Sequence, residues 1–234
     1  MESKAEQSHG PKLAGRLDLA YLRFDSSASV AGLRATVEQV QRYGFRSLCV
    51  PPVLAGTVKK NYPRLRVCAV VAYPLGTESL AAKTFAVSEL AEQGIDEIDF
   101  VLDLFALVND NWAKAELEVK QLGELCMRNK VVSKAIIETP VLTEAQIRRV
   151  AEIIKPTPVP FIKTSTGYHR EPTSLDHVRL LRDVVGRDKM LKASGGIATY
   201  DQARAMFAAG ADIIGTSNAA AIVEEARAVE QTVE

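Results

Sequence analysis

The chain has 234 residues, 47% of them hydrophobic, which is enough for one sizeable core and close to the roughly 250 residues of a (β/α)8 barrel. Its 29 basic and 29 acidic residues cancel and are spread along the whole length, which excludes the basic field that binds a nucleic acid backbone. No apolar run approaches the ~18 residues that a membrane span requires. We therefore expect a soluble protein that forms one domain over residues 1–234 and binds a small molecule.

The first 14 residues form a polar N-terminal extension without the apolar stretch of a secretory signal, so a cytoplasmic location is expected. Three cysteines, Cys49, Cys68 and Cys126, are widely spaced and odd in number, which is typical of a reduced compartment rather than a disulfide framework. The three histidines show no zinc-ligand spacing with a cysteine or carboxylate. We expect no metal site.

Short apolar runs recur along the chain at intervals of about 20 to 30 residues, and each indicates a strand. The longer segments between them place apolar residues at a spacing of 3.6 with charges on the other face, which is typical of amphipathic helices. The repeat is strand then helix, eight times. The predicted strands are LDLAYL from Leu17, SLCV from Ser47, VCAVVAY from Val67, IDFVL from Ile98, VVSKAII from Val131, FIKTS from Phe161, MLKAS from Met190 and ADIIGT from Ala211.

This repeat predicts an α/β fold, a closed (β/α)8 TIM barrel. Its strands are covered on both sides and should be continuously apolar, as VCAVVAY and IDFVL are. Gly44, Gly94 and Gly210 each lie between a helical segment and the next strand, where a left-handed C-cap is expected, and Thr143 can act as an N-cap. A doubly wound open sheet is the alternative, but no GxGxxG motif follows the first strand.

Three successive predicted strands carry a lysine, which needs a reason because burying an uncompensated ammonium group is costly. These are Lys134, Lys163 and Lys192, in the fifth, sixth and seventh strands; Asp99 lies in the fourth and Asp18 in the first. Inward side chains near the C-terminal ends of barrel strands build the active site. A structural ion pair, or a lysine that reaches solvent, remains open for any one of them, but their clustering favours an active site.

A lysine attacks a carbonyl only as the neutral amine, so a reactive lysine needs surroundings that disfavour its charged form. Burial and a second ammonium group nearby both do this. Lys192 can act in this way on Lys163, and Asp99 can accept and return protons as a carbinolamine forms and dehydrates. We therefore predict Lys163, Asp99 and Lys192 as the catalytic residues of a Schiff-base enzyme.

The segment FIKTSTG around Lys163 resembles the deoxyribose-phosphate aldolase family, and the resemblance runs in order from Leu17 to about Val223. It implies that Lys163 forms the Schiff base, Lys192 perturbs it and Asp99 relays protons. It also implies reversible cleavage of 2-deoxy-D-ribose 5-phosphate to acetaldehyde and D-glyceraldehyde 3-phosphate, without a metal or organic cofactor. The other matching blocks are LCVPPVL at Leu48, VVAYPLG at Val70, DEIDFV at Asp96, KAIIET at Lys134, LKASGGIAT at Leu191 and GADIIGTS at Gly210.

The substrate is expected to meet two further groups of residues. The turns after the seventh and eighth strands precede helices, and such N–H groups suit a phosphate. Cys49 either lines the pocket or packs as a small buried thiol. The substrate-binding candidates are Asp18, Cys49, Tyr73, Lys134 and Thr164, and the phosphate-binding candidates are Gly195, Gly196, Gly215, Ser217 and Asn218.

The chain departs from the usual family pattern around the substrate. Ala198 stands where members commonly carry an arginine after the paired glycines, so one phosphate cation is missing. Asn218 replaces a second serine, Ala20 replaces a hydroxyl residue in the first strand, and Tyr73 replaces the usual phenylalanine. These positions all lie on the side of the site that selects the substrate.

Two alternatives to the implied reaction remain open. Either His169 and Arg170 replace the lost charge, or they form an ordinary solvated loop; without a replacement, the enzyme would be a Schiff-base aldolase of a different or unphosphorylated aldehyde acceptor. The other alternative is a non-catalytic barrel that binds a sugar phosphate. A homodimer that pairs through helices is expected for a barrel of this kind.

Overall fold

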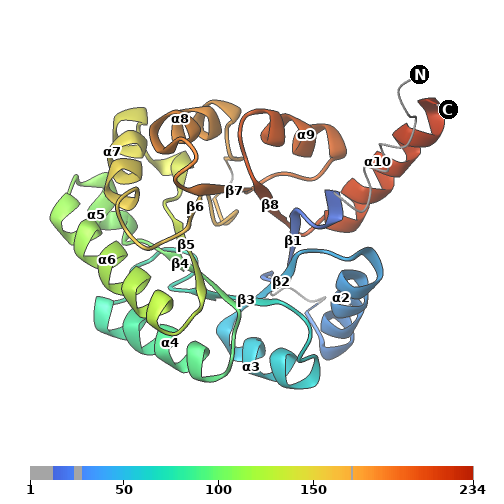
Figure 1. Cartoon of the computed structure of the whole chain (residues 1–234), viewed down its shortest axis with the longest axis horizontal. Helices are drawn as coiled ribbons and strands as arrows, with labels where there is room; N and C mark the ends of the chain where they lie inside the picture. The colour runs from blue at the N-terminus through green and yellow to red at the C-terminus, as the bar shows by residue number, and fades with distance from the viewer. Residues whose placement is uncertain (1–12, 24–27, 170, 234) are drawn as a thin grey trace.

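The computed structural model describes residues 13–23, 28–169 and 171–233 (Figure 1). In this part of the chain eight parallel strands close into a barrel in the order β1 to β8, with β8 paired to β1. The (β/α)8 TIM barrel predicted from the repeat is confirmed; seven strands fall within their predicted apolar runs, and β4 begins one residue earlier, at Glu97. The strands are β1 (Leu17–Ala20), β2 (Ser47–Val50), β3 (Val67–Val71), β4 (Glu97–Val101), β5 (Val132–Ile136), β6 (Phe161–Lys163), β7 (Met190–Ser194) and β8 (Ile213–Thr216).

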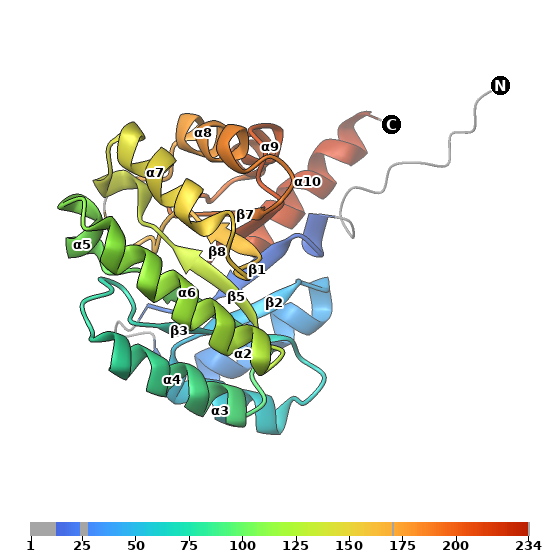
Figure 2. The ribbon, with the colours of Figure 1, turned by 60° about the vertical axis from the view of Figure 1, so that its left-hand side comes forward.

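Helices surround the strand ring on the outside, as Figures 1 and 2 show from two directions. The connection after β4 contains a short helix before the long one, and a 3-10 turn follows β5. The helices are α2 (Val30–Tyr43), α3 (Pro52–Asn61), α4 (Leu80–Glu92), α5 (Leu104–Val108), α6 (Trp112–Arg128), η1 (Thr139–Val141), α7 (Glu144–Ile154), α8 (Leu175–Val185), α9 (Tyr200–Ala208) and α10 (Ala219–Val233).

Local sequence signals set several helix ends. Helix α2 stops at Gly44, whose left-handed φ of 71° is the expected C-cap conformation. Thr143 and Thr199 each form a capping box with the glutamine three residues later, so the N-cap predicted at Thr143 is confirmed. Helix α4 is capped by Ser79, whose side chain accepts a hydrogen bond from the N–H of Ala82.

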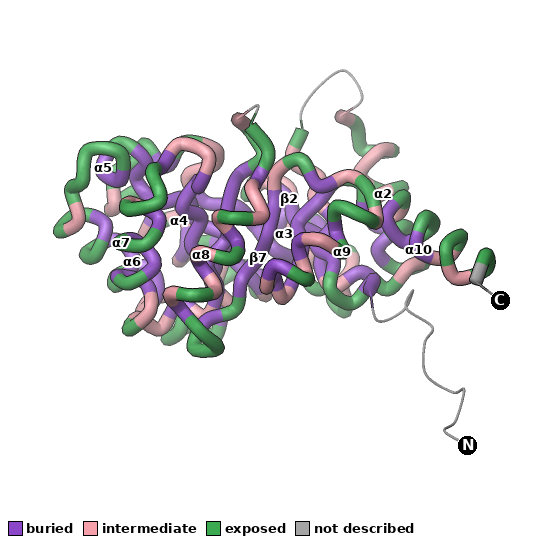
Figure 3. The backbone as a smooth tube through the Cα atoms, turned by 90° about the horizontal axis from the view of Figure 1, so that it is seen from above, coloured by how far each residue is buried: buried purple, intermediate pink, exposed green. Residues whose placement is uncertain are grey.

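The strands are buried on both faces, as predicted, and Figure 3 shows the exposed residues on the outer helices. The inside of this barrel differs from the usual layers of branched aliphatic side chains. Six charged side chains project from the strands and are at most 3% exposed. They are Asp18, Glu97, Asp99, Lys134, Lys163 and Lys192.

The start of the described chain is already part of the core. Leu13 and Ala14, which the sequence analysis placed in the polar extension, are buried against the barrel, while residues 1–12 of that segment lie outside the described residues. Among the described helices, none combines the length and the apolar character needed to cross a bilayer.

A buried ion pair between two outer helices, α4 and α6, binds the loops at the carboxyl ends of β3 and β4. Lys83 on α4 forms an ion pair with Glu118 on α6 and donates to the carbonyls of Gly76 and Val101, at 2.8 and 2.9 Å. The other carboxylate oxygen of Glu118 accepts the N–H of Asp103 at 2.9 Å. The pair thus fixes both loops that leave β3 and β4.

Replacing Lys83 with methionine is expected to lower the free energy of unfolding by about 3 to 5 kcal/mol, because it leaves the Glu118 carboxylate buried without its cation. Chemical denaturation of the purified protein measures this change. Arg149, in an exposed pair with Glu152, is the matched control, and Arg149→Met should change stability by less than about 0.5 kcal/mol. Equal losses of unfolding free energy in the two variants would show that the buried Lys83–Glu118 pair does not stabilise the fold.

Candidate active site

Strand register stacks the charged side chains in layers inside the barrel. Asp99 on β4 is in register with Lys134 on β5, and Lys163 on β6 is in register with Lys192 on β7. The register partner of Lys134 on β6 is Phe161, two residues before Lys163. Inward side chains alternate along a strand, so Lys134 lies one layer below the two other lysines.

Asp99 is the centre of this arrangement. Its Oδ1 accepts from Lys134 Nζ at 2.7 Å, and its Oδ2 accepts from Lys163 Nζ and Lys192 Nζ, each at 2.9 Å. Burial by itself raises the pKa of Asp99, but the three ammonium groups outweigh burial and hold that pKa well below its usual range. One ionised carboxylate therefore serves all three lysines.

A second set of contacts continues below Asp99. Arg46, just before β2, pairs with Asp18 at 2.9 Å and with Glu97 at 2.7 Å. Asp18 pairs with Lys192 at 2.7 Å and Glu97 with Lys134 at 2.5 Å. Seven largely buried side chains form one connected network, which we call the charge ladder; the more exposed Arg66 also contacts Glu97, at 3.4 Å, and is not counted in it. Its members are Arg46, Asp18, Glu97, Lys134, Asp99, Lys163 and Lys192.

The three lysines of the charge ladder are not equivalent. Lys134 and Lys192 each contact two carboxylates, which outweigh burial and raise the pKa of both lysines. Lys163 contacts one carboxylate, that of Asp99, and shares it with the other two. Four cations face three carboxylates in the ladder, and Lys163 is the cation with the least compensation.

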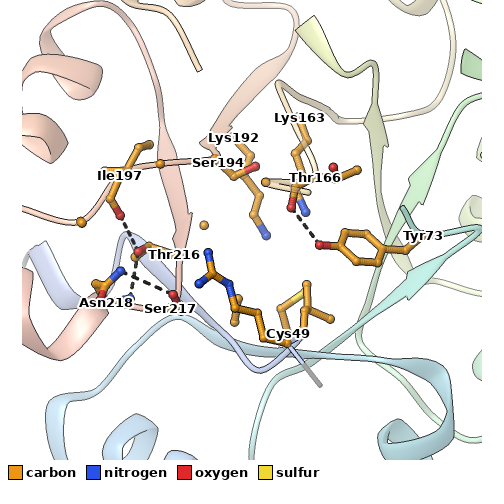
Figure 4. Close-up of a pocket in the computed structure, with 18 residues that line it drawn as sticks. Cys49, Tyr73, Lys163, Thr166, Lys192, Ser194, Ile197, Thr216, Ser217 and Asn218 are labelled. Atoms are coloured by element: carbon orange, nitrogen blue, oxygen red, sulfur yellow. Dashed lines mark hydrogen bonds between the residues drawn. The ribbon is translucent and has the colours of Figure 1, made fainter. Parts of the chain in front are cut away.

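A cavity of about 240 Å³ opens at the carboxyl ends of the strands, and both Lys163 and Lys192 point into it (Figure 4). Cys49 and Tyr73 form one side, and the turns after β7 and β8 form the other. Asp99 lies below this cavity and contacts it through the two lysines. The cavity thus gives a small molecule access to the amine of Lys163.

The structure brings two of the five substrate-binding candidates, Cys49 and Tyr73, to the cavity wall. Asp18 and Lys134 are fully buried in the charge ladder and do not line the cavity. Thr164 is also buried, with its hydroxyl bonded to the backbone of Ser194 at 3.0 and 3.1 Å. The three reach the site through residues that they contact: Asp18 through Lys192, Lys134 through Asp99 and Thr164 through Ser194.

All five phosphate-binding candidates line the cavity: Gly195, Gly196, Gly215, Ser217 and Asn218. Packing also requires a glycine at position 215, because a Cβ there would lie 2.7 Å from Cε of Lys192. The N–H of Asn218 is occupied by the hydroxyl of Thr216 at 2.9 Å. The most accessible phosphate donors are thus in Gly195, Gly196 and Ser217.

The four departures from the family pattern, at Ala20, Tyr73, Ala198 and Asn218, all border the cavity. The Tyr73 hydroxyl donates to the carbonyl of Thr166 at 3.1 Å, as Figure 4 shows, and so joins the β3 and β6 loops over the site. Burial raises the pKa of Tyr73 to about 12, so this hydroxyl stays protonated.

Of the two residues proposed to replace the lost cation, the structure describes only His169. His169 is not among the residues that line the cavity, and Arg170 lies outside the described residues. Arg23, which the sequence analysis did not consider, does line the cavity. Its position just after the first strand, at the end of the barrel where active sites form, was the signal that could have revealed it.

Cys49 and Cys68 are register partners on β2 and β3, and both thiols are free. A hydrogen bond with Cys68 lowers the pKa of Cys49, whereas burial raises that of Cys68. Together with Asp99 they place three potential ligand atoms within 4.8 Å of one another. Asp99 already holds three ammonium groups, and a cation would meet their repulsion, so we assign no metal here.

A closed β/α barrel with a lysine-lined cavity at the carboxyl ends of its strands is a barrel enzyme in its architecture. Residues 16–218 match the DeoC/LacD family of aldolases. The chain belongs to this family, and the protein is therefore an aldolase, a lyase that acts on a carbon–carbon bond.

Relatives cover almost the whole chain. Deoxyribose-phosphate aldolase from Caldicellulosiruptor saccharolyticus is 36% identical over 92% of this chain and 98% of its own length. The solved structure of an aldolase called QR15 has a TM-score of 0.87 at 31% identity and covers 95% of this chain and 99% of that chain. A tetrameric deoxyribose phosphate aldolase from Aeropyrum pernix has a TM-score of 0.86 at 27% identity, with 94% and 93% covered.

Proposed function

We propose that this protein is a class I deoxyribose-phosphate aldolase that cleaves 2-deoxy-D-ribose 5-phosphate reversibly to acetaldehyde and D-glyceraldehyde 3-phosphate. The observation that carries the proposal is the amine of Lys163, which lies in the cavity and contacts a single, shared carboxylate. Names of similar proteins over nearly the full chain support the same substrate.

In this reaction the neutral amine of Lys163 attacks the aldehyde carbon C1 of the open-chain sugar, and loss of water gives an iminium ion. Removal of the proton from the C3 hydroxyl turns C3 into the aldehyde carbon of glyceraldehyde 3-phosphate, which leaves as the C2–C3 bond breaks. The electron pair of that bond moves into the iminium to form an enamine. Protonation of the enamine and hydrolysis release acetaldehyde and regenerate the lysine. The iminium serves as the electron sink, so the reaction requires no further cofactor.

The neighbours of Lys163 suit these proton transfers. Asp99 Oδ2 lies 2.9 Å from both Lys163 Nζ and Lys192 Nζ, so it can take a proton from one amine and return it near the other. Lys192 stays charged because Asp18 and Asp99 hold it as an ammonium. Lys163 contacts one carboxylate, that of Asp99, so of the two lysines at the cavity we assign to it the attack on the carbonyl.

Two alternatives to this function were left open: a non-catalytic barrel that binds a sugar phosphate, and an aldolase whose acceptor carries no phosphate. Membership of an aldolase family disfavours the non-catalytic barrel. An aldolase of an unphosphorylated acceptor would use the same lysine, so only a comparison of substrates separates it from the main proposal. The cytoplasmic location and the homodimer stay predictions; the buried free thiols suit a reducing compartment.

Borohydride trapping tests the proposed chemistry. Incubation of the protein with acetaldehyde and borohydride should add one reduced two-carbon adduct, and peptide mass mapping should place it on Lys163. Turnover of 2-deoxyribose 5-phosphate should then exceed that of 2-deoxyribose. An adduct on another lysine, or no adduct, would remove the basis of the mechanism, and equal turnover would favour the unphosphorylated acceptor.

A further inference from the structure

Three cationic side chains line the cavity: Lys163, Lys192 and Arg23. The two lysines are engaged with Asp99, and Lys192 also with Asp18. Arg23 is exposed, and no described residue forms an ion pair or hydrogen bond with its guanidinium. Among the described residues it is thus the cavity cation whose charge is available to a ligand.

The wall formed by the β7 and β8 turns offers polar backbone but no cation. The N–H groups of Gly195, Gly196, Ile197 and Ser217 have no protein acceptor in the described structure. The side chain of Gln202 occupies the N–H groups of Ala198 and Thr199, so the two amides just before α9 are not available. These free N–H groups can orient a phosphate, but the charge that would neutralise it must come from elsewhere.

Arg23 lies where it can supply that charge. It follows β1, and β1 is the barrel neighbour of β8, whose turn carries Ser217. The same cavity is bordered by Ala198, the position of the missing family arginine. A guanidinium also presents paired N–H donors that match two oxygens of a phosphate.

We propose that Arg23 binds the phosphate group of the substrate and replaces the cation absent at Ala198. This inference rests on the proposed function, because it assumes that the aldolase substrate carries a phosphomonoester. Arg23 thereby sets the preference of this enzyme for a phosphorylated over an unphosphorylated sugar, although it follows β1 and the arginine it replaces would follow β7.

Steady-state kinetics of Arg23→Gln with two substrates tests this role. The ratio of kcat/KM for 2-deoxyribose 5-phosphate to kcat/KM for 2-deoxyribose should fall by about 10- to 100-fold, mainly through KM for the phosphorylated sugar, since one charge-assisted contact is lost. Arg23→Lys should keep part of the ratio. Arg64→Gln removes an exposed arginine from the opposite end of the barrel, before β3, and should leave the ratio unchanged.

A second variant tests the replacement itself. Adding Ala198→Arg to Arg23→Gln puts a guanidinium back on the β7 side of the cavity and should restore much of the ratio. The inference is overturned if Arg23→Gln leaves the ratio unchanged, or if it lowers turnover of both sugars equally, because a merely structural residue would act in that way.

Binding of inorganic phosphate, measured by titration calorimetry, separates this inference from the proposed function. Arg23→Gln should weaken the binding of phosphate by about 10-fold or more, whether or not the parent cleaves a sugar. If the parent shows no aldolase turnover but its phosphate binding depends on Arg23, the proposed function is wrong and the anion site at Arg23 is supported. Phosphate binding that is equal in parent and variant would overturn the site.

Discussion

Replacing Lys163 with methionine is expected to lower kcat for the cleavage of 2-deoxyribose 5-phosphate by about 10⁴-fold or more, because the variant has no amine to form the iminium. Folding should be retained. Methionine has a similar shape, and Asp99 keeps its contacts with Lys134 and Lys192. The measurement is a coupled assay of glyceraldehyde 3-phosphate, with circular dichroism as the check of folding.

The same variant should give no borohydride adduct with acetaldehyde. Lys120 on α6 is exposed and serves as the control, since Lys120→Met removes a lysine without touching the cavity and should keep both activity and trapping. An active Lys163→Met enzyme would show that another group performs the chemistry. A borohydride adduct on Lys192 in that variant would show that Lys192, and not Lys163, forms the Schiff base.

Replacing Asp99 with asparagine is expected to lower kcat by about 10²- to 10⁴-fold, because the group that moves protons between Lys163 and Lys192 is lost. It should also lower the free energy of unfolding by about 3 to 5 kcal/mol at neutral pH, because the buried ammonium groups lose their shared carboxylate. Asp183→Asn, at an exposed position on α8, is the control for both measurements. Parent-like kcat in Asp99→Asn would exclude the carboxylate from the proton path.

The loss of stability in Asp99→Asn should depend on pH. The pKa of Asp99 is held well below that of an unfolded aspartate, about 3.9, so its ionised form stabilises the fold above pH 4 and this contribution is lost as pH falls. The difference in unfolding free energy between parent and variant should therefore narrow between about pH 5 and pH 2. Urea denaturation across this range measures it, and a constant difference would contradict the ionised state of Asp99.

The barrel was predictable from the chain because its signals are local. Continuous apolar runs of strand length, amphipathic segments between them and a glycine such as Gly44 at a helix end each follow from burial or backbone geometry over a few residues. Lys163 and Lys192 stood out for the same reason, since a charge within an apolar strand contrasts with its immediate neighbours.

The depth of each side chain was not predictable, because it depends on how the strands are staggered. Lys134 pairs in register with Phe161 rather than Lys163, which puts it under the cavity floor. Arg46 and Glu97 were missed as members of the charge ladder, since their partners come from strands distant in sequence. Arg23 was missed because it follows its strand in an ordinary polar loop and has no local contrast.

The charge ladder also limits how this protein can diverge. Each carboxylate in it serves at least two cations, from Arg46 at the amino end of the barrel to Lys163 at the mouth. A substitution at one member leaves a neighbour uncompensated and changes the effect of a second substitution at that neighbour. The ladder residues are therefore expected to change together in descendants of this sequence, whereas a position such as Ala20, which lines the cavity but has no contact with the ladder charges, can vary without this constraint.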